Sequence, residues 1–220
     1  MCSRPIYEFC KRAFDFAVSA TGLLVCAPLM LIVALSIRWS SPGPILYQGL
    51  RVGKNKTQFR VLKFRTMVIN AEQVGGSCTA DDDPRITAIG RILRKTKLDE
   101  LPQLLNVLRG EMSLVGPRPE LERFTQLYDE RQQQVLTLKP GITDLASMWD
   151  SDEGARLAGA HDPEQAYVET ILPHKLELQL KYLDTRSFWV DLVIVLRTVT
   201  LVMQRAVPMF FHDGYEVNQE

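Results

Sequence analysis

The feature that most constrains this chain is an uncharged run of 22 residues, from Phe16 to Ile37. As a helix rising about 1.5 Å per residue, the run would extend about 33 Å, enough to cross the hydrocarbon core of a bilayer. A secretory signal peptide has a shorter apolar stretch and a better small-x-small cleavage site. A buried helix of a soluble protein normally shows a polar face, which this run barely has. The run therefore predicts a helix inserted in a membrane.

The path of this helix depends on Pro28, which lies near the middle of the run. A proline there deletes one backbone hydrogen bond and clashes with the preceding turn, so it favours a bend. Lys11 and Arg12 precede the run and Arg38 follows it, as expected of headgroup anchors. Because cations flank both ends, the positive-inside rule does not indicate which end of the run is cytoplasmic. The residues leave open a re-entrant helix bent at Pro28 and an ordinary span with a tolerated proline.

Composition narrows the class of protein further. Lys+Arg and Asp+Glu balance at 26 each, so no global positive field indicates nucleic-acid binding. The four cysteines, Cys2, Cys10, Cys26 and Cys78, form no CxxC motif, and the histidines have no zinc-ligand spacing. We therefore expect a reduced, cytosol-facing protein without a disulfide framework and without nucleic acid as a partner.

Downstream of the membrane segment, the residue patterns predict a helix-dominated α+β fold. Ile45–Gln48 and Gln58–Phe64 are typical of two short strands around a turn at 53–56, which predicts a small β-hairpin. Apolar residues at helical spacing predict helices over Ile86–Leu98 and Asp99–Leu108, the second closed by Gly110. Further helices are expected at Leu121–Leu138, Pro163–Tyr182 and Phe188–Met203, the last as an amphipathic helix at the membrane interface.

The stretch 83–119 carries most of the chemical information. Asp99 and Glu100 follow a run of five cations, Arg85, Arg91, Arg94, Lys95 and Lys97. One interpretation makes Asp99 the N-cap of a helix, with Glu100 near the positive end of the helix dipole. Capping alone does not require so many cations. A second interpretation is that the two carboxylates belong to a site built for phosphate.

Arg118 strengthens the second interpretation. It lies in Gly116–Pro119 between two prolines, which fix the backbone and lower the entropy lost when the arginine binds a phosphate. A planar guanidinium suits a diphosphate better than the point charge of a lysine does. Carboxylates among phosphate-binding cations are what an enzyme needs to hold Mg²⁺ and attack phosphorus at one site. Asp99 and Glu100 are therefore the candidate catalytic residues and metal ligands.

Five motifs now connect the chain to a known family. They are KRAFDF (11–16), KFRTM (63–67), DPRIT (83–87), LDELPQLLNVLRGEMSLVGPRP (98–119) and KPGIT (139–143). With these motifs the chain resembles the bacterial sugar transferases, also called monotopic phosphoglycosyl transferases. The resemblance covers most of the chain, and the long block around LDELPQ and GPRP is its most specific part.

The resemblance implies a two-step reaction. Asp99 matches the family nucleophile, which attacks the sugar-linked phosphate of a UDP-sugar and expels UMP; undecaprenyl phosphate then attacks the phospho-sugar aspartate. Glu100 completes the acidic pair and helps to organise Mg²⁺. An aspartate at a helix start among cations is expected to stay ionised at neutral pH. The residues expected to bind phosphate or substrate are Arg85, Arg94, Arg118, Lys63 and Arg65.

The family also bears on topology, because its members use a re-entrant helix broken at a Ser-Pro pair. Here the pair is Ala27–Pro28, which keeps the proline but lacks the hydroxyl that could bond a freed carbonyl. Nucleotide sugars are cytosolic, so a true span would export Lys11 and Arg12 against the charge rule. We therefore expect a re-entrant helix over 1–40 and a catalytic domain over 41–205 on the cytosolic face of the bacterial inner membrane. A C-terminal tail is expected over 206–220.

The chain departs from the family where many members continue GIT with Gly-Trp, because it has Asp144 to Met148 there. This departure indicates either an altered donor site or drift in a loop. A rival hypothesis is a non-catalytic membrane scaffold that binds anionic lipid through the basic stretch 85–97. A multi-span transferase would need more membrane segments than the sequence offers. The sugar and the glycan pathway stay open, and a homodimer is compatible with the sequence.

Overall fold

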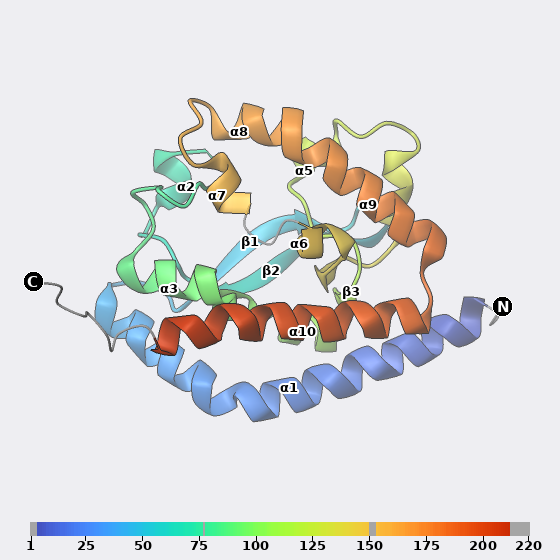
Figure 1. Cartoon of the computed structure of the whole chain (residues 1–220), viewed down its shortest axis with the longest axis horizontal. Coiled ribbons are helices and arrows are strands. Elements are labelled where there is room, and N and C mark those ends of the chain that lie inside the picture. The colour runs from blue at the N-terminus through green and yellow to red at the C-terminus, as the bar shows by residue number, and fades with distance from the viewer. Residues whose placement is uncertain (1–3, 77, 150–152, 212–220) are drawn as a thin grey trace, which may run out of the picture.

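The computed structural model of the chain describes residues 4–76, 78–149 and 153–211. Its first element is the helix α1 (Arg4–Ser40), which contains Pro28 and is long and apolar enough to cross a membrane. Figure 1 shows that α1 bends in its middle, with both ends rising toward the rest of the chain. Near the bend the apolar side chains of Leu24 and Val25 are 77% and 70% exposed. The bend therefore points away from the protein core.

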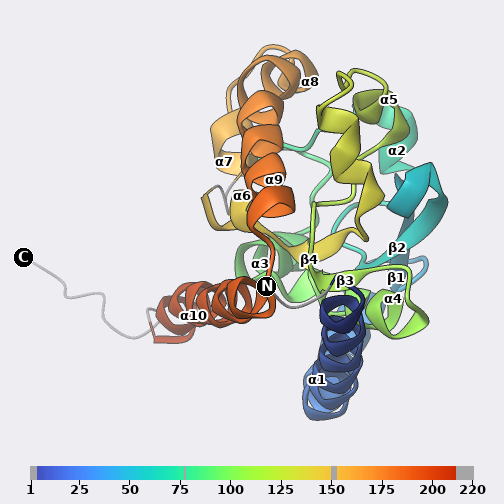
Figure 2. The same cartoon turned by 90° about the vertical axis from the view of Figure 1, so that its right-hand side faces the viewer.

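A second long helix, α10 (Phe188–Phe211), runs beside α1 on the same side of the molecule, while the shorter elements lie on the other side (Figures 1 and 2). Apolar side chains such as Trp189, Leu196 and Met203 are exposed on α10. The predicted apolar helix at Phe188–Met203 is confirmed, and it continues to Phe211. The expected tail boundary at 206 therefore falls inside α10, and residues 212–220 lie outside the described ones.

The predicted β-hairpin is present. Strand β1 (Leu46–Val52) pairs antiparallel with β2 (Gln58–Phe64), in a register that sets Leu46 opposite Phe64. The turn η1 (Lys54–Lys56) joins them, with Asn55 at a left-handed φ of 54°. Phe59 and Val61 of β2 pack on α4 (Gln103–Arg109), which places one face of the hairpin over the centre of the molecule.

Between the hairpin and α4 the chain forms α2 (Ala71–Val74), α3 (Ala88–Thr96) and the 3-10 turn η2 (Leu98–Glu100). Thr87 caps α3, because its side chain accepts a hydrogen bond from the N–H of Gly90. Gly110 ends α4 at a φ of 83°, as the sequence predicted. The predicted helix at Asp99–Leu108 is wrong in its first turn, because the residues of η2 form a separate 3-10 turn before α4 begins.

Two short parallel strands, β3 (Ser113–Val115) and β4 (Gly141–Thr143), were not expected. Three residues are too few to show an alternating pattern in a sequence. Gly116 and Gly141 allow the two segments to touch, since a Cβ on Gly141 would lie 2.1 Å from the nitrogen of Gly116. The close pairing brings the GPRP and KPGIT motifs together.

The remaining elements form a helical layer above the strands (Figure 1). The region Leu121–Leu138, predicted to be helical, is helical in part, because the chain forms α5 (Glu122–Thr125) and the 3-10 helix η3 (Gln132–Thr137) there. The predicted helical region Pro163–Tyr182 is confirmed. The elements of this layer that follow β4 are α6 (Leu145–Trp149), α7 (Glu153–Leu157), α8 (Pro163–Ala166), the π-turn η4 (Tyr167–Ile171) and α9 (Leu172–Thr185).

Three cations fasten α1 and its end to the rest of the chain. Arg12 donates to the carbonyls of Val107 (2.6 Å) and Leu108 (3.0 Å), which lie at the C-terminal end of α4. Lys11 forms a 2.8 Å ion pair with Asp191 on α10. Arg65, at the end of the hairpin, donates to the carbonyls of the turn after α1. The long helix is therefore tied to the element that follows the acidic pair.

Candidate active site

The acidic pair, Asp99 and Glu100, lies in the turn η2 between α3 and α4. Lys97 precedes the turn with a left-handed φ of 59°, and its N–H donates to the carbonyl of Arg94. This conformation ends α3 and redirects the chain, while Pro102 leads into α4 with a helical backbone. In this turn the side chain of Asp99 lies in the protein interior, and Asp99 is 6% exposed.

Asp99 does not cap a helix, so the capping interpretation of the sequence is wrong. The N-cap position of α4 is Pro102, and no side chain caps that helix. Within the described residues, the buried Oδ1 of Asp99 has no hydrogen-bond partner. Burial raises the pKa of Asp99 above its ordinary value, although Lys63 and other cations oppose the shift. Burial thus works against the ionised state that the sequence predicted.

Glu100, unlike Asp99, has direct hydrogen bonds to cationic side chains. Its Oε1 accepts hydrogen bonds from Nζ of Lys63 (2.8 Å) and from Arg118 (2.7 Å). Burial by itself would raise the pKa of Glu100, but Arg118 and Lys63 hold it well below the usual range. Two adjacent carboxylates whose pKa values are driven apart are typical of groups with different chemical tasks.

Further cations complete the surroundings of the pair. Arg94 and Lys97 both lower the pKa of Asp99 through their charge, and Arg94 donates a long 3.4 Å bond to the carbonyl of Thr79. With Lys63 and Arg118, the site holds four cations against two carboxylates. A surplus of two positive charges suits an anionic ligand such as a diphosphate.

Two of the predicted phosphate-binding residues, Arg85 and Arg65, donate hydrogen bonds to groups outside the acidic pair. Arg85 donates to Asp83 and to the carbonyls of Ala71 and Gly76, and this pairing holds the pKa of Asp83 below its usual value. Arg65 donates to the turn after α1. Neither has a contact with Asp99 or Glu100, so their roles as phosphate ligands stay predictions. Lys11 and Arg12 likewise have intramolecular partners, and Arg38 is exposed; their role as headgroup anchors stays a prediction.

Asp144 is a residue of the site region whose role sequence reasoning missed. It is fully buried, and its Oδ2 accepts hydrogen bonds from the backbone N–H of Arg118 (3.2 Å) and from Gln179 (3.1 Å). Its Oδ1 accepts from the N–H and hydroxyl of Ser147 at 2.6 Å each. The residue at which this chain departs from the family pattern after GIT is therefore a buried carboxylate that contacts the backbone of Arg118. An aspartate three residues before Ser147 at a helix start was the available signal.

A buried network fastens the other end of the GPRP segment. Glu120, just after Pro119, accepts hydrogen bonds from Tyr167 (2.6 Å) and Lys175 (3.0 Å), and Lys175 also donates to Tyr167 at 2.8 Å. Lys175 is 4% exposed, so this ion pair lies in the helical core. The segment that carries Arg118 is thus held at two points, by Asp144 at the backbone N–H of Arg118 and by the contacts of Glu120 two residues further on.

The acidic pair also fits a magnesium ion. Mg²⁺ keeps several waters and binds through one or two carboxylates together with substrate phosphates. The unbonded Oδ1 of Asp99 and the carboxylate of Glu100 provide such a set. No group of three or more His, Cys, Asp or Glu side chains is arranged for a metal in the part of the chain that the structure describes.

An acidic pair within a surplus of cations, on a chain with an exposed apolar helix, defines a membrane-associated protein whose site suits phosphate chemistry. Comparison with known sequences gives the family. The model of the family "Bacterial sugar transferase" matches residues 6–205, and the chain belongs to this family.

Relatives from several bacteria share this similarity. The exopolysaccharide production protein PSS of Rhizobium leguminosarum is 41% identical over 89% of this chain and 96% of its own length. The UDP-glucose:undecaprenyl-phosphate glucose-1-phosphate transferase of Caulobacter vibrioides is 39% identical over 89% of this chain and 70% of its own. The UDP-N-acetylgalactosamine-undecaprenyl-phosphate N-acetylgalactosaminephosphotransferase of Aeromonas hydrophila is 37% identical over 90% of this chain. The chain spans 45% of that relative's length.

Proposed function

We propose that this protein transfers a sugar-1-phosphate from a UDP-sugar to undecaprenyl phosphate, as the first membrane step in the assembly of a bacterial glycan. The observation that carries the proposal is the buried Asp99, whose Oδ1 has no partner among the described residues and which lies among cations. A buried carboxylate beside a phosphate-attracting site is positioned for attack on phosphorus. Relatives named as undecaprenyl-phosphate sugar phosphotransferases support the same reaction.

In the proposed first half-reaction, an oxygen of Asp99 forms a bond to the sugar-linked phosphorus and the bond to UMP breaks. In the second, an oxygen of undecaprenyl phosphate forms the bond to phosphorus and Asp99 leaves as a carboxylate. Arg118 and Lys63 neutralise charge near the phosphates while holding Glu100 in place. Asp99 is deprotonated when it attacks, and the phosphate-binding cations favour that form.

A magnesium ion bound by Asp99 and Glu100 would neutralise phosphate charge and orient the donor. The partnerless Oδ1 of Asp99 is the atom best placed to take up a metal bond. Chelation by EDTA is expected to abolish turnover, and added Mg²⁺ to restore it. Full activity in a metal-free preparation would exclude the metal role.

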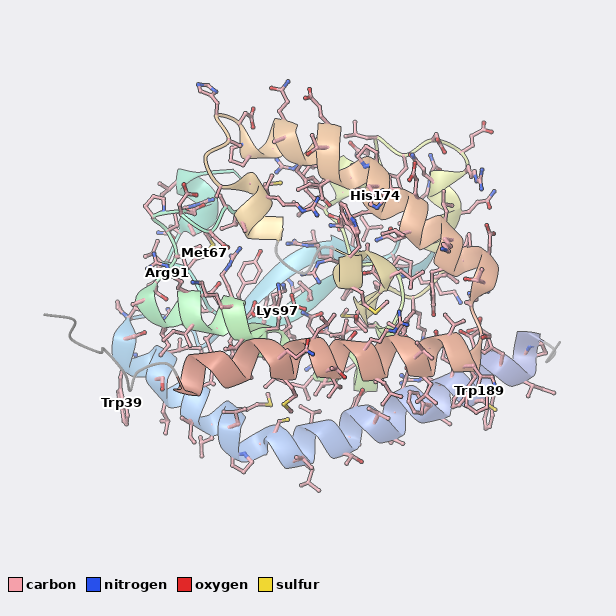
Figure 3. All side chains as sticks on the ribbon, in the orientation of Figure 1. Trp39, Met67, Arg91, Lys97, His174 and Trp189 are labelled. Atoms are coloured by element: carbon pink, nitrogen blue, oxygen red, sulfur yellow. The ribbon has the colours of Figure 1, made fainter. Side chains whose placement is uncertain are left out.

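The helix α1 is proposed to be re-entrant, with both ends at the cytosolic face of the inner membrane. Its bend and its exposed apolar side chains around Pro28 support this path (Figure 1). Trp39 and Trp189 are 81% and 73% exposed, and Figure 3 shows both extending from the layer of α1 and α10 on the side where α1 bends away. Exposed tryptophans of this kind favour the interface between headgroups and acyl chains. A lipid bilayer is therefore proposed as a partner.

A screen of UDP-sugars for UMP release tests the reaction. The purified protein in nanodiscs is incubated with undecaprenyl phosphate, Mg²⁺ and UDP-glucose, UDP-galactose or UDP-N-acetylgalactosamine. We expect release with at least one donor, and Asp99→Asn is expected to lower it roughly 10³-fold or more, as for loss of a nucleophile.

Three outcomes have different meanings. A phospho-sugar adduct on the wild type, absent from Asp99→Asn, would support the covalent step. Release that survives in Asp99→Asn would exclude Asp99 as the nucleophile. No release with any donor would favour the non-catalytic lipid-binding scaffold.

A further inference from the structure

Lys97 is a cation of the candidate site whose ammonium group has no direct hydrogen-bond or ion-pair partner among the described residues. Its side chain is partly buried, and within the described residues its ammonium group forms no hydrogen bond and no ion pair. Glu100 and Asp99 lie close enough to act on it through their charge, but Glu100 already accepts bonds from Lys63 and Arg118. A partly desolvated ammonium without a direct partner is unfavourable unless a ligand supplies one.

The backbone conformation of Lys97 is also energetically unfavourable. Its φ of 59° and ψ of 14° lie in the left-handed region, which is unfavourable for a lysine because of its Cβ. Glycine and asparagine are the usual residues at this position after a helix. A lysine at a strained backbone position, whose ammonium group has no direct partner among the described residues, points to a ligand at this site.

The position of Lys97 indicates which ligand this is. It ends α3 and precedes the turn η2 that holds the acidic pair, and Figure 3 shows it where the chain leaves α3, beside α10. Four cations face two carboxylates there, and Lys97 and Arg94 are the two that do not bond to Glu100. An anion with several oxygens would satisfy both.

We propose that the ammonium group of Lys97 binds a substrate phosphate next to Asp99, which makes Lys97 a substrate-binding residue of this site. The proposal rests on the proposed function, since that function supplies two phosphate-bearing substrates. The ligand is either the diphosphate of the nucleotide sugar or the phosphate of the polyprenyl acceptor. In this role Lys97 exchanges no proton with either substrate.

The variant Lys97→Asn separates this role from a structural one. Asparagine accepts the left-handed conformation, so we expect the thermal midpoint to stay or to rise by about 2–4 °C, as a stabilisation of about 1 kcal/mol would give. If Lys97 binds phosphate, catalytic efficiency falls roughly tenfold or more at the same time, because a hydrogen bond to a charged group is lost. Lys97→Arg keeps the charge and should retain more activity than Lys97→Asn. Lys95→Asn, an exposed cation on α3, is the matched control for net charge.

The two half-reactions identify the source of the phosphate. The single-turnover rate of UMP release without acceptor, measured against the UDP-sugar concentration, gives the efficiency of the first half-reaction, and transfer from the preformed adduct to undecaprenyl phosphate gives that of the second. A fall confined to the first assigns Lys97 to the donor diphosphate, and a fall confined to the second assigns it to the acceptor. UDP is a further probe, since it should raise the thermal midpoint of the wild type more than that of Lys97→Asn if Lys97 binds the donor.

The proposal is overturned if neither efficiency falls further in Lys97→Asn than in Lys95→Asn. It is also overturned if activity falls only in proportion to a loss of folded protein. Failure of the proposed function looks different, because the wild type itself would then release no UMP with any donor.

Discussion

At the scale of single residues, burial gives the two neighbouring carboxylates different properties. Glu100 is paired with Lys63 and Arg118, whereas Asp99 has an oxygen without a partner in the described part of the chain. Arg118, which contacts Glu100, is itself held through its backbone by Asp144. The arrangement of the site therefore depends on Asp144, a buried carboxylate outside the acidic pair.

Asp144→Ala is expected to lower both stability and activity. The buried N–H of Arg118 and the amide of Gln179 would lose their acceptor, at about 1–3 kcal/mol for each group left unsatisfied. Arg118 would then be less well positioned, so kcat/KM for the donor should fall by more than the folded fraction does. The control is Ser147→Ala, which removes a partner of Asp144 without freeing Arg118. Equal activity in the two variants, corrected for folding, would contradict the positioning role.

The pair of Asp83 and Arg85 predicts a pH dependence of stability. Arg85 holds the pKa of Asp83 below its ordinary value of 3.8 through hydrogen bonds. The pair therefore stabilises the fold fully above that value, and the contribution is lost as pH falls through the lower pKa of the folded state. Thermal unfolding of Asp83→Asn should show a deficit at pH 7 that vanishes in acid. Asp82→Asn, an exposed neighbour, should show no such deficit; a deficit independent of pH would refute the linkage.

At the scale of elements, the position of α3 is set by contact with a backbone. The N-cap Thr87 donates from its backbone to the carbonyl of Thr66, and a Cβ on Gly90 would lie 1.9 Å from that oxygen. Only a residue without a side chain allows α3 to approach so closely. This approach places Arg94 and the turn with Asp99 beside the hairpin that carries Lys63.

Gly90→Ala is therefore expected to destabilise the protein, although alanine favours a helix by about 1 kcal/mol in isolation. Overpacking against the rigid carbonyl of Thr66 should cost about 1–3 kcal/mol and displace α3. Arg91→Ala, at an exposed position of the same helix, should change the thermal midpoint little. Thermal unfolding and UMP release measure both effects, and a stabilised, fully active Gly90→Ala would show that α3 can shift freely.

At the scale of the whole molecule, the two long helices α1 and α10 lie on one side and the shorter elements on the other (Figure 2). Both long helices expose apolar side chains, and the acidic pair lies in the short turn η2. Arg12, on α1, is bonded to the end of α4, and Lys11 pairs with Asp191 on α10. The long apolar helix α1 is therefore joined directly to the elements around the acidic pair.

Replacing Pro28 should change how α1 lies in the membrane. Pro28→Leu restores a backbone hydrogen bond and removes a clash, so the helix is expected to straighten and to span in part of the molecules. The exposed Cys10 reports the N-terminal end, and a cysteine introduced at Arg38 reports the other. In wild-type cells neither should react with a reagent confined to the periplasm, whereas Cys10 should become reactive in Pro28→Leu. Reaction of wild-type Cys10 from the periplasm would contradict the re-entrant path.

Features carried by neighbouring residues could be predicted from the sequence. The apolar run, the hairpin, α3, the glycine that ends α4 and the family motifs all lie within short windows, because periodicity and turn chemistry are local properties. The acidic pair was visible for the same reason, since Asp99 and Glu100 follow a run of cations. The helix predicted to begin at Asp99 was nevertheless wrong in its first turn, because Leu98–Glu100 form a 3-10 turn.

Only the tertiary structure decided which charges meet. Lys63 and Arg118 are 37 and 18 residues away from Glu100, and Asp144 is 26 residues away from Arg118. The sequence placed Arg85 and Arg65 in the same phosphate-binding set, but packing gave them other partners. The physical reason is that ion pairing and burial depend on distance in space. The sequence by itself determined the long apolar helix and the chemical groups, and packing determined which of those groups surround Asp99.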